Sequence, residues 1–315
     1  MSEPEKSGSW EREVLEKVAL AAVKEQRIAR RWSIFFKILG FSYLFILLFL
    51  LMNWGSDKNL DMTGKHTALV ELKGTIAEGE VSADQIIGSL QEAYKDTNTQ
   101  GVILRINSPG GSPVQAGQIY DEMNRLRAKY PKIPLYVVVD DLCASGGYYV
   151  AAAADKIYVD KASLVGSIGV LMDGFGFMGT MEKLGVERRL ITAGANKGFL
   201  DPFSPVNVQQ EAYAKVMLAQ IHEQFIHAVR TGRGKRLHET PDMFSGLVWS
   251  GEESVRLGLA DGLGSTESVA RDVIHAEKIV DFTPQDGFAD RFAKKFGVEL
   301  GKNINPLAMM NPSLR

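Results

Sequence analysis

The stretch that decides the fold is IPLYVVVDDLCASGGYYVAAAADKIYVD, residues 133–160. It begins at 133–140 with apolar and β-branched residues, a run that is typical of a buried strand. Ser145 and two glycines follow, and the alanine-rich segment after them favours a helix before a second strand at 156–160. A strand, a helix and a strand in this order predict a parallel pair joined by a crossover helix.

The same alternation continues on both sides of this stretch. In chain order we expect a strand at 67–76, a helix at 82–96 with Ser82 as its N-cap, a strand at 101–107, a helix at 114–130, a strand at 186–194, a long helix at 206–230 and a helix, turn and strand at 250–265. The sequence therefore predicts an α/β domain of βα repeats around a largely parallel sheet.

The composition is that of an ordinary globular protein, with 45% hydrophobic and 23% charged residues and a net charge of −2 over 315 residues. Without a basic excess to neutralise phosphates, we expect no nucleic acid partner. Cys143 is the single cysteine, and the five histidines show no spacing typical of a metal site. We expect neither a metal nor another cofactor.

An apolar segment near the N-terminus predicts a membrane anchor. Residues 38–56 carry no charge, and extending the segment back to Trp32 adds only Lys37. That length crosses a hydrocarbon core of roughly 30 Å. Trp32 and Trp54 stand at its two ends, where interfacial anchors belong. A cleaved signal peptide is the alternative, but the segment before it is long and no A-x-A-like site follows.

The flanking charges predict the orientation of this anchor. Seven basic residues precede the span: Lys6, Arg12, Lys17, Lys24, Arg27, Arg30 and Arg31. The positive-inside rule places the N-terminus in the cytoplasm and the rest of the chain on the other side of the plasma (inner) membrane. The expected organisation is a cytoplasmic helix at 1–31, a transmembrane anchor at 32–54, a linker at 55–66, an extracytoplasmic domain at 67–275 and a tail at 276–315.

Ser145 is the first candidate for chemistry, because a serine at a strand-to-helix turn exposes its hydroxyl in front of a helix N-terminus. The N–H of Gly146 can then face a developing oxyanion. The turn Ser108-Pro109-Gly110-Gly111 follows a neighbouring strand and can supply a second N–H. Taken alone, Ser-Gly-Gly at a helix start is more typical of an N-cap with a flexible turn. The alternative for the second turn is a phosphate-binding loop, but no Gly-Lys-Ser/Thr or GxGxxG supports a nucleotide loop here.

A nucleophilic serine needs a base, and no histidine lies in the glycine-rich part of the sequence. Lys197, in the loop 192–205, is the remaining candidate. It must lose its proton near neutral pH, which requires a dry surrounding for which Phe199 and Phe203 are candidates. Ser167 could hydrogen-bond the neutral amine. An ordinary solvated lysine remains the alternative.

Four collinear motifs carry a resemblance to a known family. They are INSPGGSPVQAGQI at 106–119, DDLCASGGYYVAAAADKIYVDKASLVGSIGV at 140–170, TAGANKGFLDPFSP at 192–205 and VWSGEESVRLGLADGLG at 248–264. Over residues 67–265, about two-thirds of the chain, the sequence resembles the signal peptide peptidase A family of serine peptidases, in its short single-domain bacterial form.

The resemblance implies a fold related to crotonase and Clp protease, and a Ser/Lys dyad. The nucleophile matches Ser145, the base Lys197 and the serine that orients the base Ser167. The oxyanion donor matches Gly110 or Gly111, and assistance from Gly146 stays open. Gly198 departs from the family pattern, which has an acidic residue after the lysine, and Asp201 is a possible substitute.

The resemblance also implies a function: a membrane-anchored endopeptidase that degrades remnant signal peptides and other flexible peptides. It implies a homo-oligomer in which serine and lysine can come from neighbouring subunits. Two alternatives stay open at this point. One is a protease that trims stomatin-type or other membrane proteins, and the other is a crotonase-like acyl-CoA enzyme or non-catalytic binding scaffold on the same fold.

Overall fold

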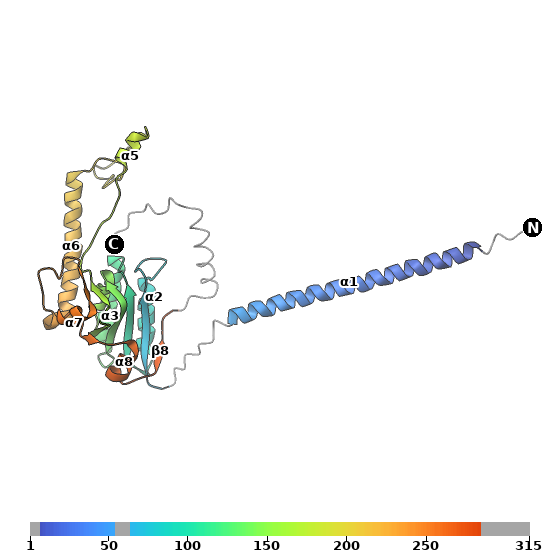
Figure 1. Cartoon of the computed structure of the whole chain (residues 1–315), viewed down its shortest axis with the longest axis horizontal. Helices are drawn as coiled ribbons and strands as arrows, with labels where there is room; N and C mark the ends of the chain where they lie inside the picture. The colour runs from blue at the N-terminus through green and yellow to red at the C-terminus, as the bar shows by residue number, and fades with distance from the viewer. Residues whose placement is uncertain (1–6, 54–63, 285–315) are drawn as a thin grey trace, which may run out of the picture. The chain divides into compact units, whose positions relative to one another are not determined.

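The computed structural model describes residues 7–53 and 64–284. It divides into two compact units, one containing the N-terminal helix and the other the rest of the described chain. Each unit is considered by itself (Figure 1).

Strands and helices alternate along much of the described chain, as the sequence predicts for a βα domain. They are α1 (Ser7–Asn53), β1 (His66–Lys73), α2 (Ala83–Lys95), β2 (Thr99–Ser108), α3 (Pro113–Lys129), β3 (Leu135–Ala144), α4 (Gly146–Ala151), β4 (Lys156–Val159), β5 (Leu164–Gly166), α5 (Met178–Lys183), α6 (Val208–Arg233), η1 (Gly234–Arg236), β6 (Val248–Ser250), α7 (Gly251–Arg256), β7 (Gly262–Leu263), α8 (Thr266–Ser268), η2 (Val269–Ile274) and β8 (Ile279–Asp281).

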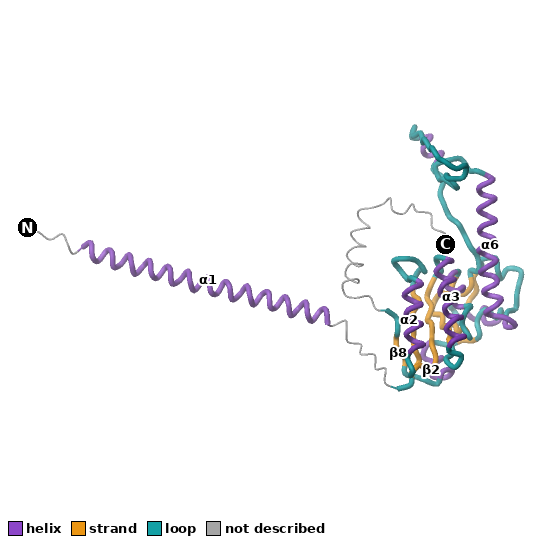
Figure 2. The backbone as a smooth tube through the Cα atoms, turned by 180° about the vertical axis from the view of Figure 1, so that it is seen from behind, coloured by secondary structure: helices purple, strands orange, loops and turns teal. Residues whose placement is uncertain are grey.

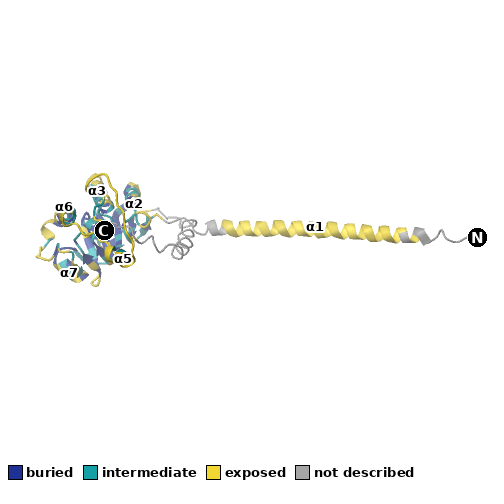
Figure 3. Ribbon diagram, turned by 90° about the horizontal axis from the view of Figure 1, so that it is seen from above, coloured by how far each residue is buried: buried dark blue, intermediate teal, exposed yellow. Residues whose placement is uncertain are grey.

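Helix α1 is one continuous helix of 47 residues. Its described side chains are exposed along the whole length (Figure 3). The stretch Arg12–Phe49 is long and apolar enough to cross a membrane, judged by length and composition, and it is the one such stretch among the described residues. This N-terminal helix is compatible with a single-pass anchor. Most of the predicted linker at 55–66, and Trp54, lie outside the described residues.

The second unit is built on an eight-stranded sheet in the order β6-β5-β3-β2-β1-β8, with β4 and β7 branching from β3. Every pairing is parallel except that of β5 with β6. Strand β3 changes partner along its length: its first half pairs with β4 and its last residues pair with β5. The largely parallel sheet predicted from the sequence is confirmed (Figure 2).

Local sequence signals account for the helices over the sheet. Ser82 caps α2 in a capping box with Gln85, as expected for a serine followed three residues later by a glutamine. Ser112 caps α3, and Pro113 occupies its first turn, where no N–H is needed. Both helices then bury one face against the sheet, so that the side chain of Ile119, for example, is fully buried.

The main core lies between one face of the sheet and α2, α3, α4 and α6. A smaller cluster on the other face packs against η2. Fully buried residues such as Leu72 and Leu104 each contribute roughly 1.5–3 kcal/mol to this core. Helix α6 comes so close to the turn after α4 that a Cβ on Gly232 would lie 1.8 Å from the carbonyl oxygen of Ala152. Glycine is therefore required at this contact.

Two segments differ from the sequence-based expectations. The predicted strand at 186–194 is wrong: these residues are exposed and form no strand. A strand needs a partner for its backbone, and this segment lies on an arm, residues 171–207, that leaves the sheet and returns at the start of α6 (Figure 1). The range expected to form the tail, 276–315, includes β8, which pairs with β1.

A buried ion pair fastens the C-terminal end of α6. The side chain of Arg233 is 1% exposed; it donates to Asp261 at 2.8 Å and to the carbonyl oxygen of Gly258 at 2.8 Å. Burial alone would raise the pKa of Asp261. The hydrogen bond and charge of Arg233, with help from the N–H of Ile157 and from Arg236, outweigh burial and lower that pKa.

We predict that Asp261→Asn lowers the free energy of unfolding by about 3 kcal/mol at pH 7, because it leaves Arg233 buried without its counter-charge. The folded pKa of Asp261 lies below its ordinary value of 3.8, so the stabilisation is present above that pH and is lost as the pH falls through the folded pKa. Denaturant unfolding of the full-length chain in mild detergent measures both effects.

The exposed pair Arg271–Asp272 supplies the control, because Asp272→Asn should change stability by less than about 1 kcal/mol. A difference between wild type and Asp261→Asn that stays constant from pH 7 to pH 3 would contradict the assignment.

Candidate active site

Ser145 occupies a strained turn between β3 and α4. Its backbone angles are φ 51° and ψ −124°, a region that L-residues rarely adopt and that costs on the order of 1–3 kcal/mol. The preceding residue, Ala144, pairs with Gly166, and the N–H of Ser145 donates to the Gly166 carbonyl at 2.9 Å. The hydroxyl does not cap α4 and makes no hydrogen bond among the described residues.

The turn Ser108–Gly111 lies directly against the Ser145 turn. A Cβ on Gly110 would come within 2.7 Å of the Cβ of Ser145 and 2.8 Å of the nitrogen of Gly146. Gly110 also has φ 103°, so glycine is required here both for conformation and for space. The expectation that these two loops meet at the carboxyl ends of neighbouring parallel strands holds in the structure.

The backbone N–H groups of these turns are not equivalent. That of Gly110 donates to the Ser108 hydroxyl at 3.1 Å. Those of Gly111 and Gly146 donate to no acceptor within the described chain, and a Cβ on Gly146 would lie 3.3 Å from the nitrogen of Gly111. Two neighbouring N–H groups without acceptors, beside a free hydroxyl, can stabilise the negative charge that develops on a substrate oxygen, as an oxyanion hole does.

Ser167 lies next to Ser145 on the adjacent strand end. It follows the Gly166 that pairs with Ala144, and neighbouring strands are about 4.8 Å apart. Like Ser145 it has φ 51°. Its N–H donates to the carbonyl of Leu247 at 2.7 Å, so the chain leading to β6 holds this serine in place.

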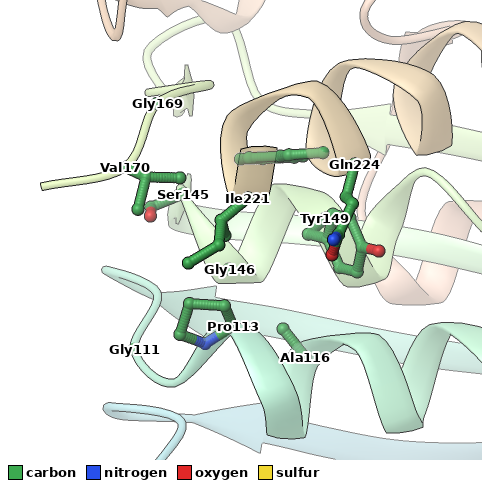
Figure 4. Close-up of a pocket in the computed structure, with 11 residues that line it drawn as sticks. Gly111, Pro113, Ala116, Ser145, Gly146, Tyr149, Gly169, Val170, Ile221 and Gln224 are labelled. Atoms are coloured by element: carbon green, nitrogen blue, oxygen red, sulfur yellow. The ribbon is translucent and has the colours of Figure 1, made fainter. Parts of the chain in front are cut away.

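A pocket opens beside Ser145 (Figure 4). It has a volume of ≈ 40 Å³ and is mostly apolar. Ile221 and Gln224 on α6 face Pro113 and Ala116 on α3 across it. The lining residues are Gly111, Pro113, Ala116, Ser145, Gly146, Tyr149, Gly169, Val170, Ile221, Gln224 and Phe225.

Aromatic rings close one side of this pocket. Tyr149 lies between Tyr120 and Phe225, with ring centroids 5.3 Å and 5.0 Å away. Burial raises the pKa of Tyr149, which keeps its hydroxyl neutral. Burial also raises the pKa of Cys143, so this thiol two residues before Ser145 behaves as a small hydrophobic group.

Lys197 is not part of this cluster. It is exposed on the arm, in a turn closed by its own N–H and the Gly194 carbonyl at 3.1 Å. The arm joins α6 at Val208, whereas the pocket uses Ile221, about 20 Å further along the helix. Figures 1 and 2 show the arm at the end of α6 that points away from the sheet. The single chain therefore brings together Ser145, Ser167, Gly110, Gly111 and Gly146, but not Lys197.

The residues considered as neighbours of Lys197 pack within the arm or against the first half of α6. Phe203 stacks on Phe177 with centroids 5.4 Å apart, and Phe199 meets Tyr213 edge-on. They do not bury the exposed Lys197 within its own chain. The carboxylate of Asp201 is held by Arg188, whose hydrogen bond, followed by that of Ser204, lowers the pKa of Asp201.

The contribution of α6 to the site was not predicted from the sequence. Ile221 and Phe225 are four apart and thus share one helix face, but nothing in the pattern says which element that face meets. His222 is half-buried and its Nε2 lies 3.1 Å from the carbonyl oxygen of Ile168, whereas His227 is exposed.

Two known protein families match parts of this sequence. The sequence profile of peptidase family S49 matches residues 127–280, and that of Clp protease matches residues 65–164. The chain belongs to peptidase family S49. The Clp protease match covers the SPGG turn and Ser145, and the S49 match covers Ser145 and Lys197.

Relatives of this S49 peptidase include proteins named as proteases. The chain is 33% identical to a protease of Methanocaldococcus jannaschii over 63% of each chain. It is 30% identical to a signal peptide peptidase SppA of Enterococcus faecium, over 62% of this chain and 56% of that protein.

A third relative carries a different name. The chain is 41% identical to a protein of Brucella melitensis named Na⁺/H⁺ antiporter NhaA, over 72% of this chain and 31% of that protein. The S49 peptidase thus spans between about one third and two thirds of these relatives. Because most of the Brucella protein is not matched, its name carries no function to this chain.

These matches, together with the sheet, confirm a Clp protease-like α/β fold and a signal peptide peptidase A family member. Membership of this family, together with a free serine hydroxyl and paired N–H donors, is compatible with peptidase activity. Among the described residues, no group of three or more His, Cys, Asp and Glu side chains gathers as metal ligands would.

The strain at Ser145 is measurable without any assay of activity. We predict that Ser145→Gly is more stable than Ser145→Ala by about 1 kcal/mol, because glycine adopts φ 51° without a Cβ clash and alanine does not. Denaturant unfolding of the two variants compares their stabilities.

Ser89 in the middle of α2 provides the matched control, since there glycine should be less stable than alanine by about 1 kcal/mol. If alanine were more stable than glycine at position 145 as well as at position 89, the backbone at Ser145 would not be strained.

Proposed function

We propose that this S49 peptidase is a membrane-anchored serine endopeptidase in which Ser145 is the nucleophile and Lys197 the general base. The observation that carries the proposal is the unbonded Ser145 hydroxyl in a strained turn, beside the free N–H groups of Gly111 and Gly146. Strain of this kind persists where function requires it.

The proposed reaction is acyl transfer in two halves. The neutral amine of Lys197 takes the proton of the Ser145 hydroxyl, and the oxygen attacks the scissile carbonyl carbon. Gly111 and Gly146 donate to the resulting oxyanion. When the C–N bond breaks, the leaving amine takes the proton from Lys197 and an acyl-enzyme remains. Water then gives a proton to Lys197 and attacks the ester, which frees the acid and returns the proton to Ser145.

In this proposal Ser167 orients the amine of Lys197. Its position beside Ser145, one strand over, supports that role. Gly110 is proposed to be structural and not an oxyanion donor, because its N–H already donates to the Ser108 hydroxyl. Its lack of a side chain lets the two turns touch.

Lys197 must then come from a neighbouring copy of the chain. The exposed arm carries Lys197 at the end of α6 remote from its own Ser145. The arm and the start of α6 also expose large apolar side chains that a monomer would leave in water: Leu171, Phe175, Leu184, Ile191, Val206 and Tyr213, with exposed fractions between 55% and 94%. Packing the arm on a neighbour would cover these side chains and place Lys197 in a dry site.

The substrates we propose are remnant signal peptides and other flexible peptides at the extracytoplasmic surface of the plasma membrane. Helix α1 supports membrane tethering, and the mostly apolar lining of the pocket supports an apolar side chain beside the scissile bond. The N-terminus would then lie in the cytoplasm, as the basic residues before the span favour.

Mixing two inactive variants tests the shared dyad. Ser145→Ala and Lys197→Ala should each lose at least about 1000-fold in kcat, because each lacks one member of the dyad. When the two full-length variants are assembled together, the intact Ser145 of one meets the intact Lys197 of the other. We predict that the mixed oligomer regains a substantial fraction of wild-type hydrolysis of an apolar fluorogenic peptide.

A mixture that stays inactive while both variants co-assemble would contradict the shared dyad. If the wild-type protein assembles but is inactive, a binding scaffold is favoured instead. If the Lys197→Ala variant is as active as wild type, lysine is excluded as the base.

The pocket makes a prediction about substrates. The pocket is small, with a volume of ≈ 40 Å³, and its lining is mostly apolar, which suits an aliphatic side chain such as that of valine or leucine. In a series of peptides that differ only in the residue before the scissile bond, kcat/KM should be highest for these aliphatic residues and at least about 10-fold lower for tryptophan and for glutamate. Equal rates across the series would rule out this pocket as the selecting site.

A further inference from the structure

His222 forms the one hydrogen bond that the described residues make between α6 and the segment after Ser167. Its Nε2 lies 3.1 Å from the carbonyl oxygen of Ile168, in a half-buried position. A carbonyl oxygen only accepts, so Nε2 carries the hydrogen. This N–H exists in the Nε2-protonated neutral ring and in the charged ring alike, so the bond does not depend on the protonation state of His222.

The bond joins two walls of the pocket. On one side, Ile168 is directly followed by the lining residues Gly169 and Val170. On the other side, His222 is directly preceded by the lining residue Ile221. These two walls touch at this bond, whereas α6 faces α3 across the pocket. By holding α6 against the segment that carries Gly169 and Val170, the bond helps to set how far α6 lies from α3, and so which side chain the pocket admits.

The bond also lies at the boundary between the fixed and the free part of α6. Towards its C-terminus, the helix is held by the contact of Gly232 with Ala152 and by the buried pair of Arg233 and Asp261. Towards its N-terminus, residues such as Tyr213 and Val216 are 65% and 57% exposed. His222 thus provides a tie between the exposed half of the helix and the chain that carries Ser167.

We propose that His222 is a positioning residue, which holds α6 at a set distance from the Ser167–Val170 segment and so aligns the substrate side chain with Ser145. The proposal rests on the function proposed above. It assigns no proton transfer to His222, because its ring bonds a backbone carbonyl and neither serine.

The chain offers a matched set of variants for the test. His222→Leu keeps much of the volume and removes the donor. His222→Gln restores an N–H donor on a side chain of similar reach. His227→Leu changes an exposed histidine on the same helix and serves as the control. All are made in the full-length chain, purified in mild detergent.

Two peptides that differ only in the residue before the scissile bond separate positioning from a general loss of structure. For the leucine peptide, His222→Leu should lower kcat/KM by about 10-fold, mostly through KM, since the displaced wall no longer contacts the leucine side chain. For the glycine peptide, which does not use the pocket, the loss should stay below about 3-fold. His222→Gln should come within about 3-fold of wild type on both peptides, and His227→Leu should equal wild type.

Three outcomes would overturn the proposal. One is that His222→Leu loses kcat/KM equally on both peptides and also has a lower melting temperature, which indicates a structural role alone. Another is no loss in His222→Leu, and the third is a failure of His222→Gln to recover activity in a folded protein.

A binding assay separates this proposal from the proposed function. In a Ser145→Ala background, anisotropy of labelled peptides should show weaker binding of the leucine peptide, but not of the glycine peptide, when His222 is also changed to leucine. That selective loss would support the positioning role of His222 even if wild type hydrolysed neither peptide. If Ser145→Ala with and without His222→Leu bound the leucine peptide equally well, the positioning role would be overturned.

Discussion

The contact between two backbone turns at the carboxyl ends of β2 and β3 is the constraint on which the rest of the site depends. Gly110 lies so close to Ser145 and Gly146 that no side chain fits between them. That approach sets the two free N–H groups side by side. Ser145 follows the residue that pairs with Gly166, has a strained backbone conformation and keeps its hydroxyl free. The stability of the packed sheet outweighs the cost of this strain.

Helix α6 connects this rigid centre to the exposed part of the domain. Its C-terminal end is fixed by a glycine contact and a buried ion pair, its middle forms one wall of the pocket, and its N-terminal end carries the arm. In our proposal, α6 serves its own site with Ile221, and the arm at its start serves a neighbour's site with Lys197. This division would make activity depend on assembly, because no single chain brings its own Ser145 and Lys197 together.

Much of the fold could be predicted because its signals are local. The β-branched run at 133–140 and the N-cap at Ser82 depend on neighbours within a few residues. The run falls largely within β3, and Ser82 caps α2 as expected. The strand expected at 186–194 fails for the opposite reason. Its residues suit a strand, but a strand also needs a partner, and the arm has left the sheet at this point.

The sequence by itself determined the βα order of the domain, the apolar N-terminal helix and the meeting of Ser145 with the SPGG turn, because periodicity and parallel-strand topology decide these. Only the tertiary structure decided which N–H groups are free, that α6 forms the pocket wall, and that Lys197 lies away from its own Ser145. These features depend on contacts between residues far apart in the chain, where packing geometry decides the outcome and residue patterns carry no information about it.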